Sequence, residues 1–137
     1  MSPRLWICLG ALSAAIAVGM GAYHAHGLER TLKDRGIDAE RMGEMMRDFE
    51  VGVHYQLFHA VGLILVGLVE WRAASRWFCA AGGFFIAGTL LFSGCLYWMV
   101  LGGGHQPWFL IPSGGMAFIL GWVMLAIGAL AARESKS

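Results

Sequence analysis

Four long apolar stretches occupy most of this chain, and no other feature restricts its possible folds so strongly. They cover approximately residues 5–27, 51–69, 77–101 and 108–132. A helix needs about 20 residues to cross the hydrocarbon core of a bilayer, and each stretch is long enough to do so. The sequence therefore predicts an integral, multi-pass membrane protein, with an all-α fold that is a four-helix transmembrane bundle.

The composition favours a single membrane domain that spans residues 1–137. The 137 residues are 58% hydrophobic and only 14% charged, whereas a soluble domain carries about 25% charged residues. The formal net charge of +1 gives no sign of a nucleic-acid-binding protein. Arg4 precedes an apolar run that exceeds the apolar core of a signal peptide, about 7–15 residues long, so we expect the first helix to be retained.

An amphipathic helix is predicted between the first two spans, at residues 39–50. Asp38 is a suitable N-cap for it, and its apolar residues recur at helical spacing: Met42, Met45, Met46 and Phe49. We expect an interfacial helix that leads into the second span, with its apolar face on lipid or on the bundle. A gate or a partner-docking helix is the alternative interpretation.

The orientation in the membrane is nearly undetermined by the sequence. Four spans place both termini on one side, and the two sides carry equally many Lys and Arg residues, so the positive-inside rule does not decide. Arg4 lies directly against the first span with no acid nearby, which favours both termini in the cytoplasm. We expect the compartment to be the bacterial cell (inner) membrane.

Small residues four apart predict the surfaces on which the helices pack. Such ladders allow close approach of helices in lipid, within one bundle or, as the alternative, between copies of the chain. Three of them stand out in the sequence: Ala11, Ala15 and Gly19 in the first span, Gly83 and Ala87 in the third, and Ala117 and Gly121 in the fourth.

Polar residues within the spans gather in the half of the bundle that faces the charged connection. Gln56 and His59 share one face of the second helix, and Thr89, Ser93 and Tyr97 share one face of the third. His59 and Ser93 each lie about 12 Å below the same surface at 1.5 Å per residue. Two interpretations follow: hydrogen bonds that fix the helix register, at roughly 0.6–2 kcal/mol each, or a polar cavity that takes a small ligand, proton or ion.

Metal and cofactor sites are not predicted. The five histidines are His24, His26, His54, His59 and His105, and neither His24/His26 nor His54/His59 has the i, i+4 spacing of a helical metal-binding pair. The three cysteines form no C-x-x-C motif.

Four sequence elements resemble those of the small YgdD/YwdK-type membrane proteins, a family that also has an animal branch. They are GAYHAHGL at 21–28, GVHYQLFHA at 52–60, LFSGCLY at 91–97, and PSGG with a following GW at 112–122. The resemblance covers nearly the whole chain. It implies a four-span membrane protein without a known biochemical activity, and it points to His26 and Tyr55 in addition to the polar residues above. The candidate polar cluster or ligand site is then His26, Tyr55, Gln56, His59, Thr89, Ser93 and Tyr97.

No motif identifies a reaction, so we expect a protein that is not an enzyme and has no catalytic residues. The favoured hypothesis is a membrane component that binds or assists a lipid or another membrane protein. One alternative is a small transporter or channel that uses the polar half of the bundle. A lipid- or quinone-directed enzyme with His59 or His26 as base is the third hypothesis, and it lacks a recognisable acid, metal or nucleophile. The expected partners are the lipid bilayer and either another membrane protein or a small ligand, and not nucleic acid.

Overall fold

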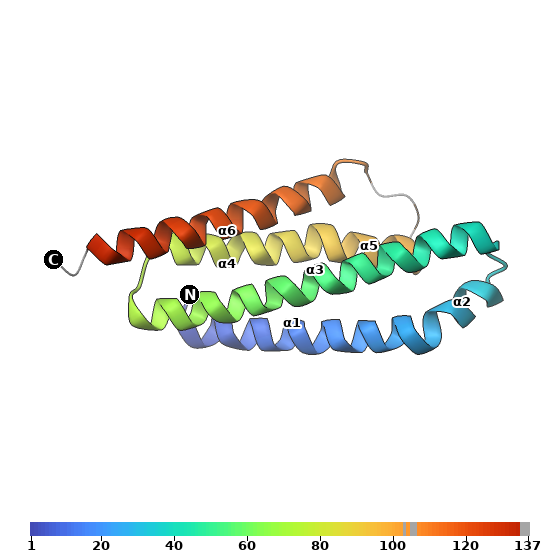
Figure 1. Ribbon diagram of the computed structural model, residues 1–137, viewed down its shortest axis with the longest axis horizontal. Coiled ribbons are helices and arrows are strands. Elements are labelled where there is room, and N and C mark those ends of the chain that lie inside the picture. The colour runs from blue at the N-terminus through green and yellow to red at the C-terminus, as the bar shows by residue number, and fades with distance from the viewer. Residues whose placement is uncertain (103, 105–106, 135–137) are drawn as a thin grey trace.

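The computed structural model describes residues 1–102, 104 and 107–134, and these are helical apart from short connections (Figure 1). No strand occurs among them. In chain order the elements are α1 (Pro3–Tyr23), the π-helical segment η1 (His24–Leu28), α2 (Glu29–Asp34), α3 (Ala39–Arg72), α4 (Arg76–Gly88), the π-helical segment η2 (Thr89–Gly94), α5 (Cys95–Val100) and α6 (Leu110–Glu134).

These elements join into four helical runs that are long and apolar enough to cross a membrane. The runs are Pro3–Asp34, Ala39–Arg72, Arg76–Val100 and Leu110–Ala131. The predicted all-α transmembrane bundle is thereby confirmed. The first run does not stop at Gly27, as the sequence had suggested, because η1 and α2 continue the helix to Asp34.

Consecutive runs lie antiparallel, with α3 between α1 and the run from α4 to α5 in the view of Figure 1. The most extensive interfaces are those of α1 with α3 and of α4 with α6. The start of α1 and the end of α6 lie at one end of the bundle, and α2 and the start of α3 lie at the other (Figure 1).

Aromatic rings packed against glycines hold the helices together. A Cβ atom on Gly82 would lie 2.5 Å from the ring of Trp6, and one on Gly88 would lie 2.5 Å from that of Phe118. Gly121 and Gly128 meet the rings of Phe85 and Phe78 in the same way. Lipid tails are as apolar as these side chains, so close van der Waals contact is the main source of stability for such an interface. The rings belong to the larger buried core: Trp6, Leu63, Val66, Phe78, Ala81, Phe85 and Phe118.

The small-residue ladder predicted on the first helix does not pack within the bundle. Ala11, Ala15 and Gly19 are exposed, and a Cβ on Gly19 would meet nothing within 4 Å. The close approach of α1 to α3 occurs instead at Gly10 and Gly67, where an added Cβ would come within 2.7 and 2.6 Å of the facing helix. Small residues spaced four apart show that one face of α1 is flat, but not that this face is buried. The large Trp6 side chain, which is 2% exposed, turns the opposite face of α1 into the bundle.

The predicted amphipathic segment is the first part of α3, continuous with the span. Asp38 Oδ1 accepts a hydrogen bond of 2.9 Å from the backbone N–H of Arg41, so Asp38 caps α3 as the sequence predicted. Gly36, at a φ of 71°, makes the preceding turn. The apolar face of the segment packs on the bundle, in a second core at the charged end: Leu28, Leu32, Met45, Phe49 and Val100.

Substituting neighbouring glycines of α4 tests the role of the ring contacts. Gly82→Ala should lower the free energy of unfolding by about 1–3 kcal/mol, because its Cβ overlaps the buried Trp6 ring. Gly83→Ala is the matched control, since a Cβ there meets nothing within 4 Å, and it should change stability by less than about 0.5 kcal/mol. Unfolding in mixed detergent micelles measures both. Equal losses would contradict the packing described here.

Candidate functional site

Gln56 occupies the centre of the predicted polar cluster and connects three helical runs. Its side chain is buried, at 5% exposure. Its Nε2 donates to the carbonyl of Ser13 on α1 at 3.1 Å and lies 3.4 Å from the Ser13 hydroxyl. Its Oε1 accepts a 2.9 Å hydrogen bond from the hydroxyl of Tyr97 on α5. The amide therefore fixes α1 and α5 relative to α3 within the membrane.

The π-helical segment η2 changes the predicted stripe of Thr89, Ser93 and Tyr97. The Thr89 hydroxyl donates to the carbonyl of Phe85 at 2.9 Å, and such a bond competes with the backbone ladder of an α-helix. Bonds from i to i+5 wind the backbone less tightly, so residues four apart no longer align as on an α-helix. Ser93 is fully buried, and its hydroxyl makes no hydrogen bond within the described residues.

His59 lies on α3 and faces α6. It is 6% exposed, and its Nδ1 donates to the Tyr55 carbonyl at 2.6 Å. Its ring stacks on that of Phe118, with centroids 3.4 Å apart and an angle of 13° between the planes. Within the described residues, no hydrogen bond or ring contact joins His59 to Ser93 or Tyr97. Gln56 and His59 are thus both buried but contact different helices.

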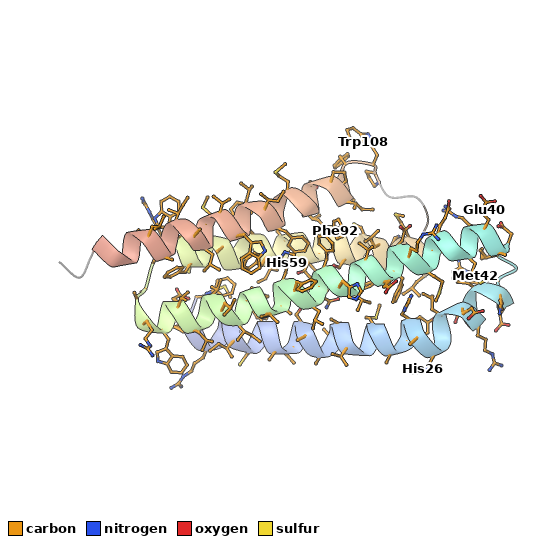
Figure 2. All side chains as sticks on the ribbon, in the orientation of Figure 1. His26, Glu40, Met42, His59, Phe92 and Trp108 are labelled. Carbon is orange, nitrogen blue, oxygen red and sulfur yellow. The ribbon has the colours of Figure 1, made fainter. Side chains whose placement is uncertain are left out.

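Tyr55 and His26 take no part in the hydrogen bonds of Gln56. Tyr55 is 42% exposed, and its ring stacks on Phe92 at 4.6 Å. His26 is exposed in η1, far along the bundle from His59 (Figure 2). The sequence-predicted residues therefore separate into the hydrogen-bonded pair Gln56 and Tyr97 and the stacked pair Tyr55 and His59. The other three join neither pair: His26, Thr89 and Ser93. Whether they form a ligand site stays a prediction.

Potential metal ligands do not cluster in the part of the chain that the structure describes. His, Cys, Asp and Glu side chains there form no group of three that could hold a metal ion. His105, one of the five histidines, falls outside the described residues.

A groove between α1 and the α4–η2 segment opens toward the lipid and reaches Gln56 at its base. Its volume is about 360 Å³. Leu12 and Leu90 at its rim are 63% and 66% exposed. The lining is mostly apolar, and its three polar residues are Ser13, Gln56 and Thr89. The apolar lining residues are Leu9, Leu12, Ile16, Leu63, Ile86 and Leu90.

Two features of this site were missed in the sequence. Ser13 accepts the Gln56 hydrogen bond, and it is the one hydroxyl side chain between Arg4 and Tyr23, a signal that could have identified it. The groove itself could not be found in this way, because it depends on the rotation of α1 and on the position of η2.

A double-mutant cycle on Gln56 and Tyr97 measures the hydrogen bond between them. Gln56→Leu and Tyr97→Phe should each destabilise the bundle, and the coupling energy should be about 0.6–1.7 kcal/mol, the range of polar contacts between membrane helices. Thr89→Val paired with Tyr97→Phe is the control, because the Thr89 hydroxyl bonds within its own helix. Additive effects in the Gln56 cycle would show that the bond contributes nothing.

Comparison with known proteins agrees with the sequence resemblance. A family described as "Protein of unknown function (DUF423)" matches residues 20–115. The chain is 36% identical over 129 residues to a UPF0382 membrane protein of Staphylococcus epidermidis, covering 93% of this chain and 96% of the relative. It is 34% identical to the UPF0382 membrane protein YwdK of Bacillus subtilis, covering 93% of this chain and 97% of the relative. It is 33% identical to the UPF0382 inner membrane protein YgdD of Escherichia coli, covering 95% and 92%.

No solved structure matches this chain. The match to the family covers well over half of the chain, and the identity to its members extends over nearly all of it. The chain is therefore a multi-pass membrane protein that belongs to the DUF423/UPF0382 family.

Proposed function

We propose that this protein is a non-catalytic membrane component that binds an acyl chain of a lipid in the groove between α1 and α4–η2. The observation that carries the proposal is the groove itself, which is open to the lipid and walled by leucine and isoleucine side chains. Ligand sites in proteins are concave, mostly apolar and supplied with few polar groups. A lipid chain is the ligand that such a groove meets at this depth.

The polar residues at the base of the groove favour a chain over an ion or a polar solute. Gln56 and Thr89 already make their hydrogen bonds within the protein. A polar solute would have to lose its hydration in exchange for groups that are already satisfied. An apolar chain gains contact with the walls and leaves the hydrogen bonds intact.

The surroundings of His59 support a non-catalytic role over the enzyme hypothesis. Its Nδ1 bonds to the Tyr55 carbonyl of its own helix, and its ring lies against Phe118 and near Phe85. A general base must lie within hydrogen-bonding reach of the proton that it abstracts, and the Nδ1 of His59 is already engaged with a backbone carbonyl. Gln56 and His59 contact different helices, which likewise disfavours a transporter or channel in which both line one polar pore.

Photocrosslinking with a phospholipid that carries a diazirine in the middle of one acyl chain tests the proposal. In proteoliposomes, peptide mapping should find more adducts at Leu12 and Leu90 than at Leu130, although Leu130 is equally exposed at 65%. Leu12→Trp should fill part of the groove and lower labelling of Leu90 several-fold. Unlabelled lipid should compete for the groove and not for Leu130.

Val18→Trp is the matched control, because Val18 is 64% exposed on the same helix and does not line the groove. It should leave the labelling of Leu90 unchanged. Adduct yields that follow side-chain exposure alone, with equal labelling at Leu12 and Leu130, would refute the proposal.

A further inference from the structure

The helical runs end at different levels at the end of the bundle that holds α2 and the start of α3, which forms a step. The run Pro3–Asp34 has 32 residues and α3 has 34, or about 48 and 51 Å at 1.5 Å per residue. The hydrocarbon core is about 30 Å thick, so both runs extend well past it. The third run, Arg76–Val100, has 25 residues. As a result, α2 and the first turns of α3 project beyond the end of α5 (Figure 1).

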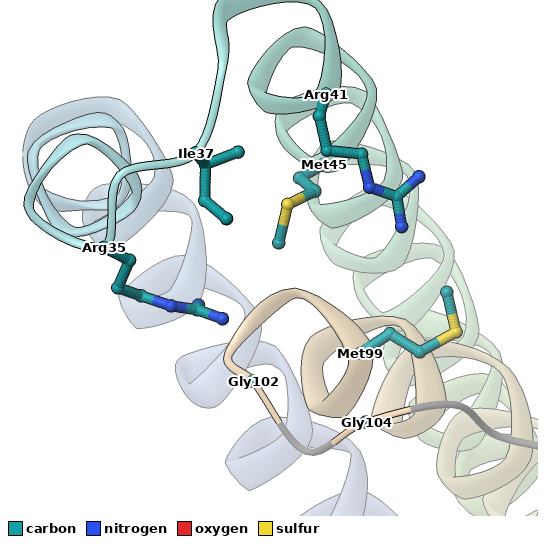
Figure 3. A pocket seen from close by; sticks show the side chains of 7 residues that line it. All are labelled: Arg35, Ile37, Arg41, Met45, Met99, Gly102 and Gly104. Carbon is teal, nitrogen blue, oxygen red and sulfur yellow. The ribbon is translucent and has the colours of Figure 1, made fainter.

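A pocket of about 330 Å³ lies on this step. Residues of the projecting part line one side of it, and residues at the end of the third run line the other (Figure 3). Arg35 reaches toward Gly102 at the end of α5, and Arg41 approaches from α3 (Figure 3). Among the described residues, the lining is Arg35, Ile37, Arg41, Met45, Met99, Gly102 and Gly104.

Arg35 is held in place with capacity to bind an anion. Its Nη1 donates to the carbonyl of Val100 at 2.9 Å, and Val100 is the last residue of α5, where the helix dipole is negative. A guanidinium group has five N–H donors, so this single bond leaves others for a second acceptor. Arg35 takes part in none of the ion pairs found within the described residues.

Two acids close to the pocket in the sequence have partners within the protein. Glu44 pairs with Arg41 at 2.8 Å, on an exposed surface of α3. Asp38 caps the same helix through the backbone N–H of Arg41. Neither carboxylate lines the pocket, so the described lining carries two guanidinium groups and no negative charge.

The depth of the pocket favours a lipid as the source of the anion. Trp98 and Trp108 are 56% and 87% exposed near this end, and exposed tryptophans are typical of the membrane–water interface. A second depression of about 510 Å³ shares Gly102 with the pocket and continues along α5 toward the membrane interior. It is lined by Gly94, Tyr97, Trp98, Leu101 and Gly102. This depression provides a place for an acyl chain below a headgroup.

We propose that this pocket binds the phosphate of an anionic phospholipid. Arg35 donates to the phosphate oxygens, Arg41 adds a second positive charge, and one acyl chain follows the depression along α5. Arginine forms paired, charge-assisted hydrogen bonds to phosphate, and basic pockets on membrane proteins recognise anionic headgroups. The site uses residues other than those of the groove beside Gln56.

Native mass spectrometry of the detergent-purified protein, titrated with phosphatidylglycerol or phosphatidylcholine, tests the site. The wild type should retain phosphatidylglycerol more strongly. Arg35→Gln should weaken this binding about fivefold, the effect of one interfacial arginine, and Arg41→Gln should weaken it in the same direction. Arg30→Gln is the matched control, since Arg30 lies on α2 with an 88% exposed side chain, pairs with Asp34 and does not line the pocket.

Each arm has an outcome that overturns the proposal. A loss in Arg30→Gln as large as in Arg35→Gln indicates general surface charge and not a site. Unchanged binding of phosphatidylglycerol in both pocket variants would show that the arginines do not contact the lipid. If Arg35→Gln does not fold, Arg41→Gln tests the proposal instead, because the Arg41 side chain is exposed. Displacement of phosphatidylglycerol by millimolar inorganic phosphate assigns the pocket to a free anion. Leu12→Trp should leave the preference for phosphatidylglycerol intact, which separates this site from the groove.

Discussion

The contact of aromatic rings with glycine backbones is the interaction on which the rest of this structure depends. Removing a helix from lipid brings little hydrophobic gain, so helices associate only where their surfaces fit closely. Trp6 against Gly82 fits α1 to α4, and Phe118 against Gly88 fits α6 to α4. The resulting rigid frame sets the spacing at which the Gln56 amide reaches both Ser13 and Tyr97.

The two π-helical segments place the polar groups within that frame. Each is accompanied by a threonine hydroxyl that bonds to a backbone carbonyl four residues earlier: Thr31 to Gly27 beside η1, and Thr89 to Phe85 at the start of η2. These bonds divert the backbone from the regular ladder, and π-helical turns occur frequently at functional sites. Both segments lie within residues 20–115, the part of the chain that the family matches.

Much of the fold could be predicted from the sequence, because span length and apolar composition depend only on the chain and the bilayer. The Asp38 cap was equally predictable, since capping is local. The inward face of α1 was not, because the ladder of Ala11, Ala15 and Gly19 competes with the single large Trp6 ring. Ladder spacing alone does not reveal which of the two faces finds a partner.

Of the candidate site, the sequence predicted the contact of Gln56 with Tyr97 but not the direction of His59. The shared depth of Gln56 and Tyr97 follows from helix rise, and the two side chains do meet. The direction of His59 could not be derived, because its position depends on the approach of Phe118 from α6. The pocket at Arg35 and Arg41 depends on unequal helix lengths and on a turn between elements far apart in the chain, which no local pattern encodes.

The pairing of α1 with α3 and of α4 with α6 has a consequence for biogenesis. Both large interfaces join spans that follow one another in the sequence, so the chain consists of two helical hairpins. Each hairpin can close as soon as its second span has entered the bilayer, before the remainder of the chain is inserted. Docking of the two hairpins through Trp6, Phe85 and Phe118 then completes the bundle. Assembly of this kind requires few contacts between distant parts of the sequence, a property associated with fast folding.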